Sequence, residues 1–256
     1  MRRQTMTEDP DSVEELFSNQ ASEYDDQTEW RQNEKILGCL KDFIGQGGGI
    51  AVDLGTGTGL VANYISPSFK MVAGVDISFQ MLQKAKSRIE YLLQGDIAEL
   101  PFKSASIDFC TMRQVLHYLE NERPVLEEIN RIVKPRGSIV LADVIVDDEK
   151  DIQWWRELKA AVQPLRKRVY SRSSHKALLD IIGFGITRQR IVQLWRKDSW
   201  DVFLRRIPAD SPDRAKVSTM LQKAVAGDVN FPVRTDRSGV QYVQYWSITR
   251  ADRLLS

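Results

Sequence analysis

Three glycines at alternate positions and an aspartate form the most informative chemical pattern in the chain. A short apolar run ends at Asp53 and is followed by Gly55, Gly57 and Gly59. Because glycine lacks a Cβ, such a loop can turn sharply or approach a ligand closely. The third glycine comes one residue earlier than in the dinucleotide fingerprint G-x-G-x-x-G. The spacing D-x-G-x-G-x-G therefore predicts a ligand loop that is not built for a dinucleotide.

Two further carboxylates follow the next two apolar runs. Asp76 comes about 20 residues after the glycine loop, a position from which a carboxylate accepts hydrogen bonds from both hydroxyls of a ribose. Asp96 follows the third run and is placed to accept from the exocyclic amine of a base. The sequence contains no G-K-[ST] phosphate loop. Together these residues predict a nucleoside ligand without phosphates.

Residues after the fourth apolar run are candidates for chemistry on a second substrate. His117 is the candidate general base, because histidine exchanges protons near neutral pH. It could instead only line the pocket, or only hydrogen-bond within the fold. Arg113 and Gln114 are candidates to orient a polar substrate. His175 is expected on the surface, at the start of a helix.

These side chains need a sheet that brings the ends of successive strands to one edge. Apolar runs predict the strands, and apolar residues at helical spacing predict the helices between them. The predicted strands are 50–54, 70–75, 90–93, 107–111, 138–146, 186–195 and 240–249, and the predicted helices among them are 60–65, 81–87 and 123–132. This alternation indicates an α/β fold, a Rossmann-like doubly wound, mostly parallel seven-stranded sheet. Ligands of such sheets bind beyond the carboxyl ends of the strands.

Five segments in this order resemble the class I S-adenosylmethionine-dependent methyltransferases, in particular the group of ubiquinone/menaquinone-type and small-molecule methyltransferases. The segments are VDLGTGTG (52–59), VDIS (75–78), GDIAELPF (95–102), SIDFCTMRQVLHYL (106–119) and RIVKPRGSIVLADV (131–144). The resemblance covers residues 12–146 well and the remainder weakly. It implies S-adenosyl-L-methionine as cofactor and S-adenosyl-L-homocysteine as product. Arg136 is a departure, because the group more often has glycine there, but it lies at the end of the sheet away from the site.

The resemblance also implies roles for individual residues. Asp53 and the glycine loop would face the methionine part of the cofactor, Asp76 the ribose and Asp96 the adenine amine. Arg113 would lie near the methionine end, and it joins His117 as a candidate catalytic residue. The full set of expected cofactor-binding residues is Asp53, Gly55, Thr56, Gly57, Gly59, Asp76, Ile77, Met81, Asp96, Ile97 and Arg113.

Two regions flank this core and are expected to form a lid over the acceptor. Residues 1–30 are predicted to be an arm with a lid helix, beginning at about Val13, and 31–256 the methyltransferase domain. Cap insertions with helical pattern are expected at about 149–170 and 197–238, although a plain surface extension would also fit the pattern. The residues expected to bind the acceptor are Tyr24, Trp30, Gln114, Trp154, Trp155 and Tyr170.

Aromatic side chains in the lid favour a small aromatic or polyketide-like acceptor, as in secondary metabolism. The second candidate is methylation of a quinone-ring carbon, because the core resembles that group. A basic run at 166–168 raises an RNA or protein acceptor, but a solvated helix face accounts for it better. The motifs are also compatible with a non-catalytic cofactor-binding subunit, and with a cyclase or decarboxylase that uses the same cofactor site.

Composition limits the remaining function classes. The chain has 36 basic and 35 acidic residues and a net charge of +1, so no overall field favours nucleic acid or a membrane surface. No apolar run approaches the roughly 20 residues of a membrane helix, and the N-terminus lacks a secretory h-region. Cys39 and Cys110 have no neighbours at metal-ligand spacing. We therefore expect a cytoplasmic monomer or homodimer with reduced core thiols and no metal.

Overall fold

A single mixed β-sheet forms the centre of the fold. The computed structural model describes residues 12–22, 24–25, 33–45, 47–196, 201–237 and 239–254; Trp30, an expected acceptor-binding residue, lies outside them. Within this part, nine strands form the sheet, seven of them in the order β3-β2-β1-β4-β5-β9-β7. These seven are β1 Ile50–Leu54, β2 Met71–Asp76, β3 Tyr91–Gln94, β4 Ile107–Arg113, β5 Val133–Val146, β7 Phe184–Arg196 and β9 Gly239–Arg253. The predicted α/β fold with a mostly parallel seven-stranded sheet is confirmed. Six of these seven strands run in the same direction, and β9, between β5 and β7, runs in the opposite direction.

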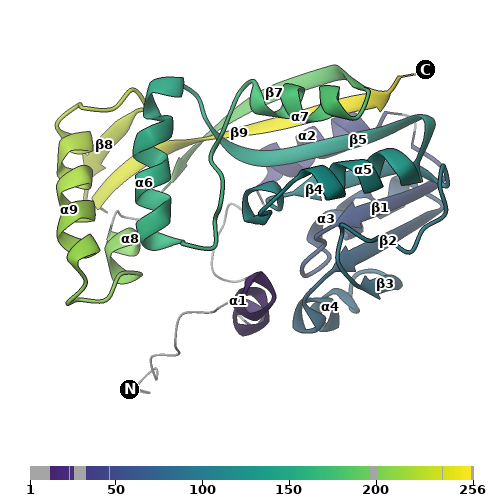
Figure 1. The fold of residues 1–256 in the computed structure, drawn as a ribbon, viewed down its shortest axis with the longest axis horizontal. Helices are drawn as coiled ribbons and strands as arrows, with labels where there is room; N and C mark the ends of the chain where they lie inside the picture. Colours follow the sequence, from purple (N-terminus) through teal and green to yellow (C-terminus); the bar gives the residue numbers. More distant parts are fainter. Residues whose placement is uncertain are drawn as a thin grey trace.

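Helices cover both faces of the sheet (Figure 1). Helices α2 (Glu34–Ile44) and α3 (Leu60–Ile65) pack on one face, and α5 (Arg123–Ile132) and α7 (Ser174–Ile181) on the other. The predicted bounds of α3 and α5 are correct to the residue. Helix α4 (Phe79–Ala85) begins two residues before the prediction, because the Ser78 side chain caps it by accepting from the backbone of Met81 at 3.3 Å.

Strand β5 alternates between the two faces and so decides where its polar residue points. Leu141 and Ile145 pack with α5 and α7, whereas Val140 and Ala142 pack with α2 and α3. Because side chains in a strand alternate with a period of two, Asp143 points to the face of Leu141 and Ile145. This carboxylate is therefore placed beneath the face that α7 covers.

The insertions form one cluster at the end of the sheet, which we call the cap. It consists of α6 (Ile152–Val162), α8 (Asp201–Arg205), α9 (Pro212–Val225) and strand β8 (Val233–Asp236). Figure 1 shows it around the start of the long strand β9, beyond the part that pairs with β5. Lys216 of α9 pairs with Glu157 of α6 at 3.3 Å, which ties the two insertions together. Short strands β8 and β6 (Tyr170–Ser171) were not predicted from the sequence.

The N-terminal arm contacts the carboxyl edge of the sheet. Helix α1 (Val13–Gln20) begins where the sequence predicts it, and its Ser18 hydroxyl donates to Gln80 at 2.9 Å. Asp25 accepts from the Thr58 hydroxyl at 2.7 Å and pairs with Arg88 at 2.7 Å. Two residues of the arm, Ser18 and Asp25, thus connect it to the segments that follow β1 and β2.

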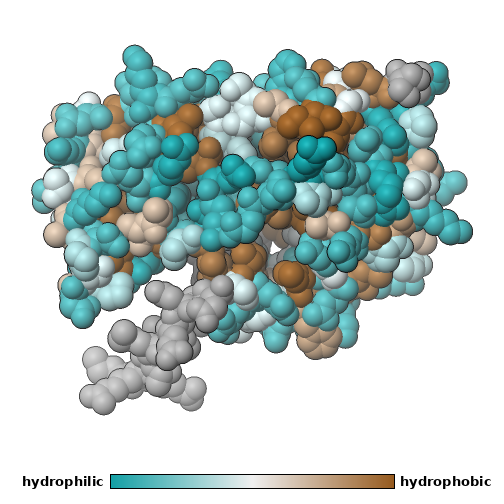
Figure 2. Space-filling view, viewed as in Figure 1, coloured by the Kyte–Doolittle hydropathy of each residue, from teal (hydrophilic) through white to brown (hydrophobic). Residues whose placement is uncertain are grey.

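The visible surface carries no continuous apolar band. Figure 2 shows hydrophobic residues in separate patches between hydrophilic ones on the face that it presents. In the ranges given above, no helix is both long and apolar enough to cross a bilayer.

Candidate functional site

Three parallel strand pairs bring the predicted cofactor residues to one edge. Leu54 of β1 is in register with Val75 of β2 and with Met112 of β4, and Asp76 with Gln94 of β3. The residues that come next along each strand therefore meet at this edge. The glycine loop follows β1 here, and Asp96 and Gln114 follow β3 and β4.

The three glycines of the loop are required for different reasons. All have positive φ, of +67° at Gly55, +55° at Gly57 and +78° at Gly59. A Cβ at Gly55 would lie 2.4 Å from a methyl carbon of Val115, so this glycine is needed for packing. A Cβ at Gly57 would meet no atom of the described residues within 4 Å. Packing thus leaves space beside Gly57, which fits a loop that approaches a ligand.

Asp76 holds the loop and still has acceptor capacity. Its two oxygens accept from the backbone N–H of Gly57 at 2.7 Å and of Ser78 at 2.9 Å. An ionised carboxylate has about four acceptor sites, so two are left for a diol. Burial raises the pKa of Asp76. The geometry fits the predicted ribose site.

Asp53 lies beneath the loop rather than on its surface. It is 2% exposed and accepts hydrogen bonds from the hydroxyls of Thr56 at 2.8 Å and Thr111 at 2.6 Å. Burial raises its pKa to about 6. Its carboxylate thus fixes the loop to β4, and a direct contact with the methionine part of a cofactor stays a prediction.

The residues expected to bind the adenine differ in how far they are exposed. Ile77 is 39% exposed, next to Asp76, and Asp96 is exposed with one oxygen accepting from the backbone of Ala98 at 2.8 Å. Ile97 is buried, and Met81 is fully buried in α4. The exposed side chain of Ile77 beside a carboxylate suits an adenine ring. Met81 is buried and can support this surface only from the core side.

Arg113 and Gln114 end β4 in different environments. The guanidinium of Arg113 lies 5.5 Å from the ring centre of Trp246, and its positive charge acts on Asp53. Gln114 has a φ of +59°, which is costly for a residue other than glycine. Its side-chain nitrogen is buried and has no hydrogen-bond partner within the described residues. Gln114 is therefore a strained residue with a free donor beside the site.

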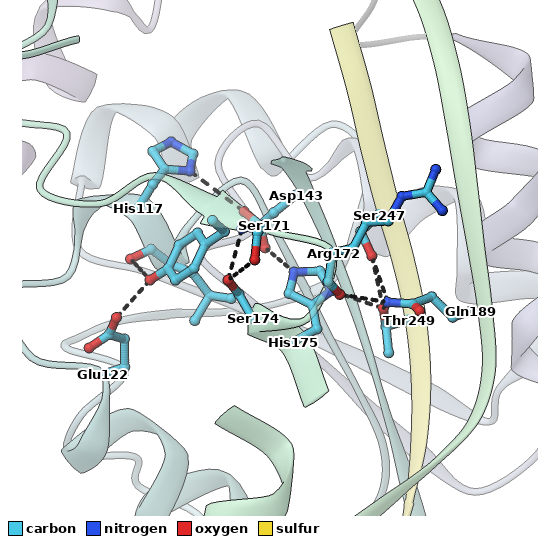
Figure 3. Close-up of polar contacts among 12 residues, drawn as sticks. His117, Glu122, Asp143, Ser171, Arg172, Ser174, His175, Gln189, Ser247 and Thr249 are labelled. Atoms are coloured by element: carbon cyan, nitrogen blue, oxygen red, sulfur yellow. Dashed lines mark hydrogen bonds and ion pairs between the residues drawn. The ribbon is translucent and has the colours of Figure 1, made fainter. Parts of the chain in front are cut away.

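A buried carboxylate separates the two histidines of the chain (Figure 3). His117 Nδ1 lies 3.6 Å from one oxygen of Asp143, and His175 Nε2 lies 3.7 Å from the other. His175 Nδ1 is 2.9 Å from the Thr249 hydroxyl. His175 is fully buried, so the expectation of a surface residue is wrong. Helix α7 packs against the sheet, and the apolar pattern around His175 does not reveal this.

Burial and neighbouring charges set the protonation of His117 and Asp143. Burial and the positive charge of Arg166 lower the pKa of His117 to about 4, although Asp143 acts in the opposite direction. Burial opposes ionisation of Asp143, but contacts with His117 and His175 hold its pKa below the usual range. At pH 7 His117 is therefore neutral, and its Nδ1 proton belongs on the side of the carboxylate. Nε2, which is buried without a partner in the described chain, carries the lone pair.

A pocket opens between His117 and the cap. The end of β5, helix α6, the segment 166–169 and β9 line it. Trp155 and Phe231 form part of its wall, with ring centres 5.0 Å apart. Of the residues expected to bind an acceptor, Trp155 faces this pocket directly.

The remaining aromatic residues expected at the acceptor lie around the pocket. Trp154 packs against Phe231 from outside the lining. Tyr170 is buried in the core, where its hydroxyl donates toward the backbone of Leu116 at 3.1 Å and Glu122 at 2.8 Å, so it is structural rather than lining. Tyr24 packs on Phe17, which in turn packs on Tyr118.

Sequence reasoning missed three residues of the site. Asp143 is a lone carboxylate within an apolar run, and that break in the pattern was the available signal. Lys159 and Arg166 line the pocket. The predicted solvated helix face at 166–168 is wrong, because helix α6 ends at Val162 and Arg166 lines the pocket, while Lys167 and Arg168 pair with Glu120 and Glu122.

Comparisons with known proteins agree with this geometry. Residues 52–141 match the family model described as a methyltransferase domain. A demethylmenaquinone methyltransferase from Staphylococcus haemolyticus is 24% identical over 90% of this chain and 91% of its own length. The chain spans less than two thirds of the length of the first three curated relatives that it matches, with shares of 60%, 43% and 64%.

Solved structures show the same fold. The YcgJ protein from Bacillus subtilis superposes with a TM-score of 0.70 at 20% identity, over 88% of this chain and 100% of that one. Geranyl diphosphate C-methyltransferase from Streptomyces coelicolor, solved with geranyl diphosphate and S-adenosyl-L-homocysteine, gives 0.58 at 16% identity, over 96% and 86%. The edge that holds the glycine loop and Asp76 is thus part of a fold shared with a protein that binds this nucleoside.

Proposed function

Because the chain belongs to the class I S-adenosylmethionine-dependent methyltransferases, we propose that it transfers the sulfonium methyl of S-adenosylmethionine to a small metabolite. The observation that carries the proposal is the meeting of the glycine loop, Asp76 and Asp96 at one sheet edge, next to a separate pocket lined by His117. The cofactor supplies an already activated methyl group. The protein has to position the acceptor and, for a phenol, alcohol or carbon acid, remove a proton.

In this proposal His117 is the general base. Its buried Nε2 is the lone-pair nitrogen, and Asp143 fixes the ring from the other side. His175 Nε2 lies 3.7 Å from the second oxygen of Asp143, and the two nearby imidazoles hold the pKa of this carboxyl below its usual range. Asp143 and His175 are positioning residues, because they act through His117 and do not border the cofactor edge, by which we mean the sheet edge with the glycine loop, Asp76 and Asp96.

The aromatic wall favours an acceptor with a flat apolar body. Trp155 and Phe231 line the pocket, and Phe17 of the arm packs on Tyr118, the residue after His117. We propose an aromatic or polyketide-like acceptor in a soluble, cytoplasmic enzyme. A quinone-ring carbon is the second candidate, because the Staphylococcus haemolyticus relative aligns across most of the chain. Labelled methyl transfer to demethylmenaquinone would favour that second candidate.

Cofactor binding tests the proposal. Asp76→Ala removes the acceptor for the ribose diol and should weaken S-adenosylhomocysteine binding roughly tenfold or more, about 1.4 kcal/mol. Calorimetry measures this, with Asp180→Ala as a control on the exposed surface of α7. An unchanged affinity of the Asp76→Ala variant contradicts the ribose assignment, and no binding by the wild-type protein contradicts the function.

A further inference from the structure

Two positive side chains beside His117 lack acidic partners. Lys159 projects from α6 and Arg166 from the segment after it, and both line the pocket together with His117. Neither forms an ion pair with any residue that the structure describes. By contrast, Lys167 and Arg168 on the same segment pair with Glu120 and Glu122 at 2.8 Å each. Arg168 also lines the pocket, but Glu122 compensates its charge, whereas no acid in the described residues pairs with Lys159 or Arg166.

The acids of the pocket wall are already engaged elsewhere. Asp147 pairs with Arg172. Asp151 accepts from Asn230, from its backbone at 3.1 Å and its side chain at 3.2 Å. Neither carboxylate therefore compensates Lys159 or Arg166.

The guanidinium of Arg166 is incompletely satisfied. One terminal nitrogen donates to the Gln114 side chain at a long 3.4 Å, and the group lies 5.6 Å from the ring centre of Tyr118. Its Nε is buried and has no hydrogen-bond partner in the described chain. A buried donor of a charged group is costly to leave unpaired. Arg166 thus presents an unused donor at the pocket, next to Gln114 and His117.

Lys159 lies among rings and other cations. Its Nζ is 5.5 Å from the ring centre of Trp155 and 5.2 Å from that of Phe203, and it donates to Gln163 at 3.1 Å. Burial and the positive charges of Arg166, Arg206 and Arg196 lower the pKa of Lys159 well below its usual range. Lys159 and Arg166 lie close together without a carboxylate from the described residues between them, which is unfavourable by itself and becomes favourable when an anion enters.

We propose that this pocket binds a methyl acceptor that carries an anionic group, a carboxylate or a phosphate, held by Lys159 and Arg166 beside His117. A guanidinium matches both anions with paired hydrogen bonds. Trp155 and Phe231 supply the wall for the apolar body of the same molecule. The identification of this anion as the methyl acceptor rests on the proposed function. An uncharged quinone would leave both cations uncompensated.

The bound anion also has a consequence for the base. Positive charge from Arg166 and Lys159 contributes to the low pKa of His117, and Asp143 faces the same ring from the core. An anion between the two cations offsets their charge, so it raises the pKa of His117. Binding of the acceptor therefore makes His117 a stronger base at the moment when a proton has to be removed.

The test compares charged and uncharged probes of one shape. Benzoate, phenyl phosphate and the neutral benzamide are titrated in low-salt buffer, into protein with and without S-adenosylhomocysteine. Calorimetry gives the affinities, and nuclear magnetic resonance follows the His117 ring, one of two histidines in the chain, assigned with His117→Gln. We expect at least one anion to bind tenfold or more tightly than benzamide and to raise the pKa of His117. Benzoate and phenyl phosphate distinguish a carboxylate from a phosphate.

Variants connect the effect to the two cations. Arg166→Gln and, separately, Lys159→Gln should lose most of the preference for the anion while keeping S-adenosylhomocysteine affinity. Lys167→Gln removes the same charge from the neighbouring residue and should keep the preference. Benzamide binding as tightly as both anions, no binding of either anion, or an unchanged preference in Arg166→Gln overturns the proposal. A protein that binds no S-adenosylhomocysteine contradicts the proposed function instead, and the titration of the cofactor-free protein still tests the anion site.

Discussion

Burial sets the protonation of the ionisable residues around the site, and it does so in opposite directions. The carboxyl of Asp53 has its pKa raised to about 6, and the imidazole of His117 has its pKa lowered to about 4. Both shifts favour the uncharged form, as expected for groups removed from water. Asp143 is the exception, because two imidazoles flank its carboxylate. The ionised carboxylate of Asp143 is thus deep in the core, and the neutral imidazole of His117 lines the pocket.

The raised pKa of Asp53 predicts how the stability of the protein depends on pH. Between the usual pKa of 3.8 and the folded pKa of about 6, the folded state binds the proton more tightly, so this group loses its stabilising contribution as pH rises through that window. From pH 7 to pH 5 the wild-type free energy of unfolding should improve by about 1 kcal/mol relative to that of Asp53→Asn. Urea titrations at both pH values measure this.

The change in the free energy of unfolding between pH 7 and pH 5 is measured for each protein, and the difference between the two changes isolates Asp53. His117 contributes with the opposite sign, since its lowered pKa gives stability above the unfolded value of 6.5 that is lost as pH falls toward 4. This contribution is the same in both proteins and cancels. An identical pH dependence of wild type and Asp53→Asn would show that the carboxyl has no raised pKa.

At the scale of elements, a two-residue strand lies between the turn that carries His117 and the cap. Strand β6 pairs with the end of β5, and its Tyr170 hydroxyl reaches the backbone of Leu116 and the carboxylate of Glu122. Leu116 begins the short 3-10 turn Leu116–Tyr118, which carries His117. The backbone N–H of Lys167 donates to the carbonyl of His117 at 2.8 Å. The segment after α6 thus fixes the turn from two sides.

Removal of one hydroxyl tests this connection. Tyr170→Phe loses a hydrogen bond to a charged acceptor and should lower the free energy of unfolding by about 2 kcal/mol. Hydrogen exchange should also become faster in the 116–118 turn than in the rest of the sheet. The exposed Tyr91→Phe on β3 is the matched control and should stay within about 0.5 kcal/mol of wild type. Equal effects of the two substitutions on the free energy of unfolding would mean that the Tyr170 hydroxyl does not stabilise the 116–118 turn.

Local pattern predicted the elements that local interactions define. Strand β1 and helices α3 and α5 begin and end where the apolar spacing and the glycine loop place them. Strand β5 begins at Val133 instead of 138, because pairing with β4 continues across an irregularity between Ile107 and Phe109. Strands β6 and β8 are too short to leave a pattern and exist through pairing with β5 and β9.

The site divides in the same way. The meeting of the glycine loop, Asp76 and Asp96 at one sheet edge was predictable, because each of them lies at or just after the end of a strand. The contact of Asp143 with His175 was not, because it depends on how α7 packs against β5. Likewise, the inward turn of Arg166 follows from where α6 ends, which the aromatic and basic run 149–170 does not show.

At the scale of the whole molecule, the sheet divides the work between its two ends. The parallel strands β1 to β4 hold the cofactor edge, and long strand β9 continues past β5 to support the cap (Figure 1). Their boundary is at His117 and the end of β5, where the pocket lies. In the proposed function, donor and acceptor are held by different parts of one sheet, so acceptor choice could change with the cap while the edge with the glycine loop stays the same.

Transfer of labelled methyl from S-adenosylmethionine to a metabolite extract tests the central claim most directly. The wild-type protein is predicted to label acidic small molecules, whereas His117→Gln should do so about a hundredfold more slowly at unchanged S-adenosylhomocysteine affinity, the usual size of a general-base contribution. Near-normal turnover in that variant would remove the base role of His117. Binding of S-adenosylhomocysteine by the wild-type protein without any labelled product would contradict the account and indicate a non-catalytic subunit.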